Sequence, residues 1–351
     1  MSGTALDGVD AAVLQTDGHR IMDFGPRDYV AYDSDAVAVL RAHLGFWQTD
    51  DVAQVKGVIE AAHLDLMQRF TGIDLAGFHG QTLAHDPAQS RTHQCGDGAN
   101  LAVAMGYPVV WDFRTADVVA GGQGAPLAPF YHFALAKWIG AQAPLAFLNL
   151  GGVGNITLVD PRYDDPADPG ALLAFDTGPA NAPINDAMQV RFGRSFDQGG
   201  QIAAMGRPDD AALQTFMKLP FFAALPPKSL DRDAFQSLVQ AVQGMADADA
   251  IATLTQAVIR SVAHGCRQCP VQPSAVYVTG GGRHNKTVMA GLAAALPCPV
   301  APVESVGLDG DMIEAQAFAF LAVRVLRGLP ISAPGTTGVA APTQGGQIAY
   351  P

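Results

Sequence analysis

The fold of this chain is decided by residues 147–159, which read Phe147-Leu148-Asn149-Leu150-Gly151-Gly152-Val153-Gly154-Asn155-Ile156-Thr157-Leu158-Val159. Two apolar runs of strand length flank a turn rich in glycine, and this pattern predicts two strands joined by that turn. Because glycine has no Cβ, the backbone of such a turn can approach a ligand closely and direct N–H groups at it. The stretch therefore predicts an anion site at the end of a strand.

A second stretch follows a few residues downstream and reads Ala174-Phe175-Asp176-Thr177-Gly178-Pro179-Ala180-Asn181. It places the carboxylate of Asp176 at the edge of an apolar run, directly before a predicted turn. Two interpretations are open from the residues alone. Asp176 could accept N–H groups of its own turn in an Asx-turn, or it could be a general base beside the phosphates of a nucleotide.

Glycine-rich turns also occur at residues 3–8 and 280–282. One such turn marks an ordinary loop more often than a site, but three turns at strand ends fit a nucleotide held between two domains. Two other nucleotide-binding motifs, the P-loop and the dinucleotide-binding fingerprint, do not match the spacing of the glycines in this chain. Asn285 stands where a P-loop needs glycine before the lysine, and no Gly-x-Gly-x-x-Gly follows the first strand, which disfavours a dinucleotide fold.

Charged side chains gather at the carboxyl end of the predicted strand over 107–114. Asp112, Arg114 and Asp117 follow one another closely there, at the strand end where α/β sheets bind ligands. An arginine between two carboxylates suits a buried structural ion pair, and it equally suits a hydroxylated ligand that bears a carboxylate.

Further candidate ligand contacts lie on other predicted elements. His79 and Gln81 form a polar pair at the end of a predicted strand over 73–79, and Glu314 lies in the first turn of a predicted helix over 313–325. Loop placement and clustered titratable groups make each a candidate. Asp7 and Asp10 in the first turn are either Mg²⁺ ligands acting through water or ordinary surface carboxylates.

Composition limits the possible partners. The chain has 351 residues, of which 49% are hydrophobic and 15% charged, so an ordered globular protein is expected. Its formal net charge is −12 without a clustered basic face, which argues against nucleic acid and anionic membranes as partners. No apolar run reaches the roughly 18 residues of a membrane span, and no leader pattern is evident. A cytoplasmic location is expected.

The length predicts two domains. We place them at residues 1–120 and 121–351, with the Pro- and Gly-rich tail over 330–351 wrapping back on the first. Helical periodicity over residues 33–71 predicts one covering helix, and a second helical pattern covers residues 249–265. An apolar run predicts a buried strand over 275–279.

Several motifs together resemble the anhydro-N-acetylmuramic acid kinase family, and their order and spacing match from the first residue to about Gly338. The motifs are residues 2–10, His79-Gly80-Gln81-Thr82, Asp112-Phe113-Arg114, residues 121–127, 149–155, 175–181, 227–232 and 279–282, and Glu314-Ala315.

The resemblance implies an α/β protein with the two-domain actin-like ATPase fold of sugar kinases and heat-shock ATPases, in which mixed sheets are flanked by helices around an interdomain cleft. It also implies ATP and Mg²⁺ as cofactors and a homodimer. The implied reaction opens the 1,6-anhydro ring of 1,6-anhydro-N-acetylmuramic acid with water and phosphorylates O6, in the recycling of peptidoglycan.

Roles carry over by position. Asp176 would be the base that activates the water, and Asp7 and Asp10 would hold the metal. Three turns would hold the nucleotide, with these residues: Gly3, Thr4, Ala5, Leu6, Asp7, Gly8, Val9 and Asp10 in the first, Gly151, Gly152, Gly154 and Asn155 in the second, and Gly280, Gly281 and Gly282 in the third. The substrate contacts would be His79, Gln81, Asp112, Arg114, Asp117, Asn181 and Glu314.

Two departures from the family pattern affect the first turn. Ala5 stands where the family has serine, and the strand that precedes Ser2 in the family is missing. Either the start codon is assigned too late or the chain lacks this strand, and in the second case the first domain is expected to have an unpaired sheet position. Two further functions remain open at this point: an actin-like kinase for an ordinary hexose or amino sugar, and a non-catalytic nucleotide-binding protein of the same fold.

Overall fold

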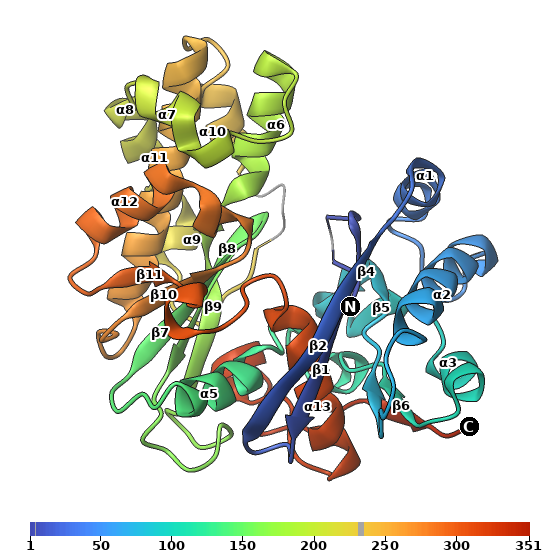
Figure 1. Ribbon diagram of the computed structural model, residues 1–351. Coiled ribbons are helices and arrows are strands. Elements are labelled where there is room, and N and C mark those ends of the chain that lie inside the picture. The colour runs from blue at the N-terminus through green and yellow to red at the C-terminus, as the bar shows by residue number, and fades with distance from the viewer. Residues whose placement is uncertain (4, 231–234) are drawn as a thin grey trace. The chain divides into compact units, whose positions relative to one another are not determined.

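A computed structural model of the chain describes residues 1–3, 5–230 and 235–351 (Figure 1). These residues form two compact units. Unit 1 comprises Met1–Gly140, Tyr163–Leu172 and Met312–Pro351, and unit 2 comprises Ala141–Arg162 and Leu173–Asp311. Thr4, a predicted nucleotide contact, lies outside the described residues.

The units begin and end at other places than the predicted domains. Helix α5 (Pro129–Trp138) belongs to unit 1, because it packs on α13 (Ile313–Leu326) and Tyr131 donates to Gln316 at 2.9 Å. The chain also returns to unit 1 at Met312, earlier than the predicted tail. Strand β12 (Gln347–Ala349) of that tail pairs antiparallel with β6 (Val109–Trp111).

The described residues of unit 1 form three small sheets. Strands β1 (Gly8–Thr16) and β2 (Ile21–Ala31) form an antiparallel hairpin, and β3 (Ala76–Gly77) completes a three-stranded sheet in the order β12-β6-β3. A third pair is formed by β4 (Gln81–Asp86) and β5 (Arg91–Cys95). The remaining elements are η1 (Pro87–Gln89), α1 (Ser34–Ala42), α2 (Ala53–Met67), α3 (Gly98–Met105), α4 (Thr115–Val119) and α14 (Pro334–Thr337).

A cavity of about 470 Å³ separates two of these sheets. Its lining includes β1 residues from Val9 to Thr16, residues 72–78 around β3, and Ala315 and Ala319 of α13. Within the described residues, β1 pairs with β2 and also meets residues 1–2 through an antiparallel bridge between Ser2 and Val9, whereas β3 pairs only with β6.

Unit 2 is built on one mixed five-stranded sheet, in the order β11-β10-β7-β8-β9. Strands β7 (Leu145–Leu150) and β8 (Val153–Val159) are antiparallel, which confirms the strand, turn and strand predicted for residues 147–159. Strand β10 (Val276–Thr279) runs parallel to both β7 and β11 (Val300–Pro302). Together with β9 (Leu172–Pro179) they form the α/β arrangement that the sequence predicts.

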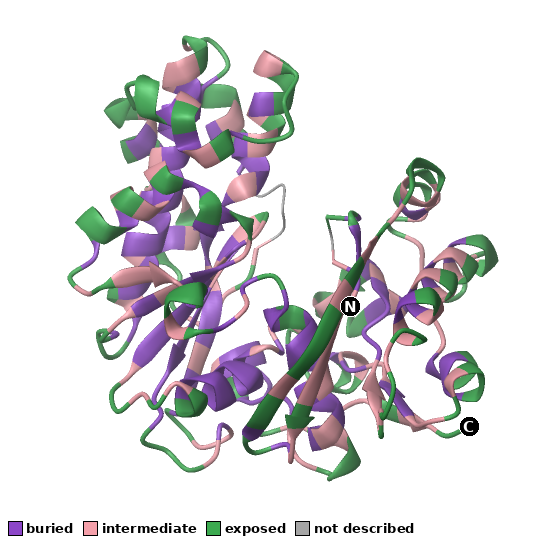
Figure 2. Cartoon of the chain, in the orientation of Figure 1, coloured by how far each residue is buried: buried purple, intermediate pink, exposed green. Residues whose placement is uncertain are grey.

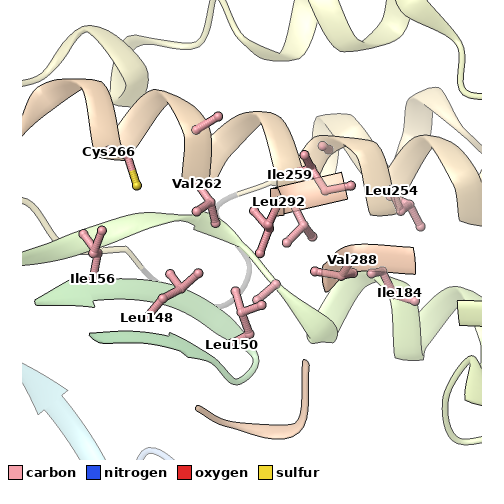
Figure 3. Packing of buried hydrophobic residues seen from close by; sticks show 14 of the residues in the cluster. Leu148, Leu150, Ile156, Ile184, Leu254, Ile259, Val262, Cys266, Val288 and Leu292 are labelled. Carbon is pink, nitrogen blue, oxygen red and sulfur yellow. The ribbon is translucent and has the colours of Figure 1, made fainter. Parts of the chain in front are cut away.

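Helices cover the sheet of unit 2, and Figure 2 shows their inner faces buried. The long helix α11 (Asp247–Gln268) confirms the predicted helix there, and its Leu254, Ile259 and Val262 pack in one cluster with Leu148 and Leu150 of β7 (Figure 3). Each fully buried Leu or Ile contributes about 1.5–3 kcal/mol relative to exposure. The other helices are α6 (Asn181–Phe192), η2 (Gln198–Gly200), α7 (Gln201–Met205), α8 (Asp210–Phe216), α9 (Pro220–Ala223), α10 (Gln236–Ala241), η3 (Gly281–His284), α12 (Lys286–Ala295) and η4 (Val303–Val306).

Three local predictions were wrong. Residues 33–71 form two helices and not one, because the chain turns at Gly45, whose φ of +91° is left-handed. The predicted strand over 73–79 is reduced to Ala76–Gly77. Asp176 does not precede a turn, since β9 continues through it to Pro179, and Gly178 adopts a φ of +150° within the strand.

Candidate active site

Asp176 lies within β9 and is fixed by a segment far along the chain. Its backbone N–H donates to Lys228 O at 2.9 Å, and its carboxylate Oδ2 accepts the N–H of Leu230 at 2.7 Å. The Lys228 ammonium in turn donates to the carbonyls of Phe221 and Ala224, each at 3.0 Å, which holds this segment in place. The carboxylate partner is thus not a residue of its own turn, and the Asx-turn interpretation was wrong.

Burial raises the pKa of Asp176 from 3.8 to about 7, although the hydrogen bond from Leu230 acts in the opposite direction. The side chain remains partly accessible, so it can meet a ligand. A carboxylate with a pKa near 7 combines a large basic population at neutral pH with a strong drive to accept a proton. Asp176 therefore has the properties of a general base.

The turn between β7 and β8 is clamped to the start of α6. Asn181 N–H donates to Gly151 O at 2.8 Å, and Ala182 N–H donates to Gly152 O at 3.2 Å. The Asn181 side chain donates through Nδ2 to Leu150 O at 2.8 Å. Asn181 is thus bound to the second glycine turn through both its backbone and its side chain. A cavity of about 280 Å³ borders this turn at Gly152 and Ala182.

The third glycine turn packs against the second. Strands β7 and β10 are parallel neighbours, so their carboxyl ends lie at the same edge of the sheet. A Cβ on Gly280 would lie 2.3 Å from Asn149 Oδ1, and a Cβ on Gly282 would lie 2.4 Å from Leu150 Cβ. The structure therefore brings the second and third turns together in unit 2, with Asn181 beside both.

Arg283 supports the third turn, a role that sequence reasoning missed. Its Nη1 donates to Gly280 O at 3.0 Å, while Nε and Nη2 pair with Glu304 at 2.7 Å and Asp311 at 2.8 Å. The position of Arg283 directly after three glycines indicates that it lies beside the turn. Its two carboxylate partners could not be predicted, because they lie 21 and 28 residues further along the chain.

The glycines of these turns fall into two classes. Gly154, Gly280 and Gly282 have no room for a Cβ, so close packing explains them. A Cβ on Gly151 or Gly152 would meet nothing nearer than 3.6 Å, and on Gly281 nothing nearer than 3.4 Å, and none of the three has a left-handed φ. The fold does not require glycine at these three positions, whereas the close approach of a ligand would.

The first glycine turn belongs to unit 1 and also contains both classes of glycine. A Cβ on Gly3 would meet no atom within 4 Å, and Gly3 has no left-handed φ, whereas a Cβ on Gly8 would clash with Val30 O at 2.3 Å. Gly8, Val9 and Asp10 lie in strand β1, so the turn itself is shorter than the predicted loop. Leu6 is buried with a φ of +57°, and Ala5 is exposed.

Asp7 and Asp10 are the predicted metal ligands. Asp7 is exposed, and Asp10 is partly buried. Within residues 1–3, 5–230 and 235–351, no three His, Cys, Asp or Glu side chains lie close enough together to hold a metal ion. These two carboxylates would therefore fit Mg²⁺ only as part of a shell completed by phosphate and water, which is how Mg²⁺ is commonly bound in kinases.

Two of the predicted substrate contacts of unit 1, His79 and Arg114, are hydrogen-bonded to each other. Arg114 donates through Nε to His79 Nε2 at 3.0 Å and through Nη1 to Gly124 O at 2.7 Å. Burial lowers the pKa of Arg114 to about 10, and the charge of Glu314 acts in the opposite direction. Burial raises the pKa of Glu314, which also lies within electrostatic range of Asp7.

Three other predicted contacts have internal partners. Gln81 is fully buried and accepts Ser2 Oγ at 2.5 Å, which ties β4 to the start of the first turn. Asp112 accepts Thr115 Oγ1 at 2.5 Å and Gln347 Nε2 at 2.8 Å. Asp117 is only 1% exposed and accepts Gly124 N–H at 2.6 Å, Ser332 Oγ at 2.5 Å and Thr337 Oγ1 at 2.6 Å. Arg114 pairs with neither aspartate by a hydrogen bond.

Among the described residues, no helix combines the length and the apolar character that crossing a membrane requires.

Comparison with known proteins extends these observations. A relative from Cereibacter sphaeroides named anhydro-N-acetylmuramic acid kinase is 60% identical over 352 residues, covering 100% of this chain and 95% of the relative. A relative of the same name from Ruegeria sp. is 59% identical over 351 residues, covering 100% and 94%. A solved activator of 2-hydroxyisocaproyl-CoA dehydratase from Clostridium difficile covers 92% of this chain and 96% of its own, with 11% identity and a TM-score of 0.45.

The family model described as anhydro-N-acetylmuramic acid kinase matches residues 1–351, the whole length of the chain. With relatives near 60% identity over their full alignments, this match identifies the chain as a member of the anhydro-N-acetylmuramic acid kinase family.

Proposed function

We propose that this protein is an ATP-dependent kinase that hydrolytically opens the 1,6-anhydro ring of 1,6-anhydro-N-acetylmuramic acid and phosphorylates O6. The products are N-acetylmuramic acid 6-phosphate and ADP, and the reaction serves the recycling of peptidoglycan. The observation that carries this proposal is the Asp176 carboxylate, whose pKa is raised to about 7, in the unit that also holds two glycine turns. Family membership supplies the substrate class.

In this reaction Asp176 takes a proton from water. The water oxygen forms a bond to the anomeric carbon, and the bond from that carbon to O6 breaks. The electron pair left on O6 attacks the γ-phosphorus of ATP, and the bond from that phosphorus to the bridging oxygen of ADP breaks. The proton on Asp176 leaves to solvent, which restores the base. Atoms and charges balance as sugar, water and ATP going to sugar phosphate, ADP and a proton.

The nucleotide is assigned to the three glycine turns. Gly3, Gly151, Gly152 and Gly281 are glycines that neither packing nor a left-handed φ explains, and all four lie in those turns. Gly57 and Gly244 share these properties elsewhere in the chain, so the argument rests on the grouping and not on one glycine. Backbone N–H groups bind phosphate without added charge, which suits a protein of net charge −12.

Mg²⁺ is assigned to Asp7 and Asp10, together with phosphate oxygens and water. When bound, the ion neutralises charge on the β- and γ-phosphates. The sugar is assigned to Arg114 and Glu314 of unit 1 and to Asn181 of unit 2, with His79 hydrogen-bonded to Arg114. Asp112, Asp117 and Gln81 are assigned a supporting role, because their described hydrogen bonds go to neighbouring protein groups. We also propose a cytoplasmic homodimer, on the family resemblance alone.

The test is a product assay in water enriched in ¹⁸O. With ATP, Mg²⁺ and the anhydro sugar, we expect one solvent oxygen at the anomeric position and phosphate on O6. Phosphorylation without ¹⁸O at the anomeric carbon would indicate a kinase for a free sugar hydroxyl. ATP binding without any sugar phosphate would refute the proposed activity.

A further inference from the structure

His79 has a single tautomer, fixed by its two partners. The side chain is 5% exposed, with Nε2 at 3.0 Å from Arg114 Nε and Nδ1 at 2.9 Å from Gly80 O. Because arginine Nε–H can only donate, Nε2 of His79 carries the lone pair, and Nδ1–H donates to the carbonyl. Burial, and then the charge of Arg114, lowers the pKa of His79 well below 6.5. The ring is therefore neutral throughout the physiological pH range.

Arg114 is held on three sides. His79 accepts its Nε–H, Gly124 O accepts an N–H of Nη1 at 2.7 Å, and the ring of Phe318 lies 5.9 Å from Cζ. The His79 ring is itself 4.5 Å from the Phe318 ring, centroid to centroid. These contacts fix the plane of the guanidinium, since its two acceptors are a buried ring and a backbone carbonyl.

The guanidinium keeps unused donors. Among the described residues its hydrogen bonds go only to His79 and Gly124, so both N–H groups of Nη2 and one of Nη1 remain. It stays charged, because its lowered pKa of about 10 is still far above neutrality. A fixed, charged guanidinium with free N–H groups matches a carboxylate in a bidentate arrangement.

We propose that His79 is a positioning residue that orients Arg114 to bind the carboxylate of the sugar, so that the pair selects acidic over neutral anhydro sugars. This rests on the proposed function, since it names how that substrate is recognised. His79 takes no proton in the reaction, because its lone pair is already occupied by Arg114. Its effect on catalysis passes entirely through the orientation of the guanidinium.

The variants His79→Leu and His79→Gln separate this role from a structural one. Leucine cannot accept Arg114 Nε–H, whereas glutamine can accept it through Oε1. Each is compared on 1,6-anhydro-N-acetylmuramic acid and on 1,6-anhydro-N-acetylglucosamine, which lacks the carboxylate. For His79→Leu we expect kcat/KM on the acid to fall about 10- to 100-fold, with a much smaller fall on the neutral sugar and an unchanged KM for ATP. His79→Gln should retain most of the preference for the acid.

A double-mutant cycle completes the test. In an Arg114→Gln background, His79→Leu should cause no further loss of preference for the acid. An equal fall on both sugars, or additive effects of the two substitutions, would overturn the positioning role. The preference for the acidic over the neutral sugar can also be measured by equilibrium binding, which does not require turnover. If the wild-type protein binds the sugars but is inactive, the proposed function is refuted, and the role of His79 can still be tested by binding.

Discussion

The carboxylate of Asp176 accepts the backbone N–H of Leu230 at 2.7 Å, across 54 residues of sequence. This hydrogen bond orients the base and stabilises its charged form, which lowers the pKa of Asp176. Burial acts in the opposite direction and is the larger effect, so the pKa is raised to about 7. Among the described residues the other carboxylate oxygen, Oδ1, accepts no hydrogen bond, and we expect it to be the atom that takes a proton from water.

The pH dependence of turnover follows from this pKa. The base is active when deprotonated, so kcat/KM should rise with pH, increasing about tenfold per unit below pH 7 and levelling above it. Initial rates between pH 5 and 9, with ATP saturating, measure the profile. A profile that stays flat between pH 5 and 7 would show that another group limits the reaction.

The same pKa predicts a stability effect of Asp176→Asn. Between pH 3.8 and about 7 the folded protein keeps a proton on Asp176 that the unfolded chain has released, so the free energy of unfolding falls as pH rises through this window. The Asn variant avoids burying a charge. Above pH 7 it should exceed the wild type in stability by on the order of 1 kcal/mol, allowing for solvent screening of a partly accessible group.

Urea unfolding of both proteins at pH 5 and pH 8 measures this difference. The advantage of the variant should be small at pH 5 and larger at pH 8. An equal difference at the two pH values would mean that the effect arises from packing and not from charge.

The local part of this site could be predicted from sequence. Gly151, Gly152 and Asp176 lie in short stretches whose residue types and spacing are informative by themselves. What could not be predicted depends on distant partners. No pattern links Asp176 to Leu230 or Asp117 to Ser332, because such contacts are set by how whole elements pack.

The same limit explains the errors in the fold. The periodicity over 33–71 hid a break, since α1 ends at Ala42 and α2 begins at Ala53, with the left-handed Gly45 in the segment between them. The turn expected after Asp176 was wrong for a related reason. Strand β9 continues through Gly178 to Pro179, and glycine is required there because a Cβ would lie 2.7 Å from Ser261 of α11.

The two classes of glycine give a matched pair of substitutions. Gly152→Val should raise the KM for ATP about tenfold or more while leaving the melting temperature nearly unchanged, because its Cβ obstructs the ligand and not the fold. Gly154→Ala should instead lower stability by about 1–3 kcal/mol, since its Cβ would lie 2.8 Å from Thr177 Oγ1.

Gly57→Ala is the control for both, because Gly57 lies in α2 with no atom within 4 Å of its Cβ position. It should leave ATP kinetics unchanged and stabilise the helix slightly. Normal ATP kinetics for Gly152→Val would remove the second turn from the nucleotide site.

Asp117 connects the loop at Gly124 to the tail at Ser332 and Thr337. Asp117→Ala leaves three buried donors without their acceptor, and it should lower the free energy of unfolding by about 3 kcal/mol or more. Asp35→Ala, at an exposed position of α1, is the matched control and should cost well under 1 kcal/mol. If Asp117→Ala kept full stability and lost only sugar affinity, Asp117 would be a direct substrate contact.

The most direct test of Asp176 as the catalytic base is the turnover of Asp176→Asn on 1,6-anhydro-N-acetylmuramic acid. Asparagine keeps the shape and an acceptor for Leu230 N–H but cannot take the proton from water. We expect kcat to fall about 10²- to 10⁴-fold, with the Kd for ATP unchanged. A variant that retains near-normal kcat would contradict the account.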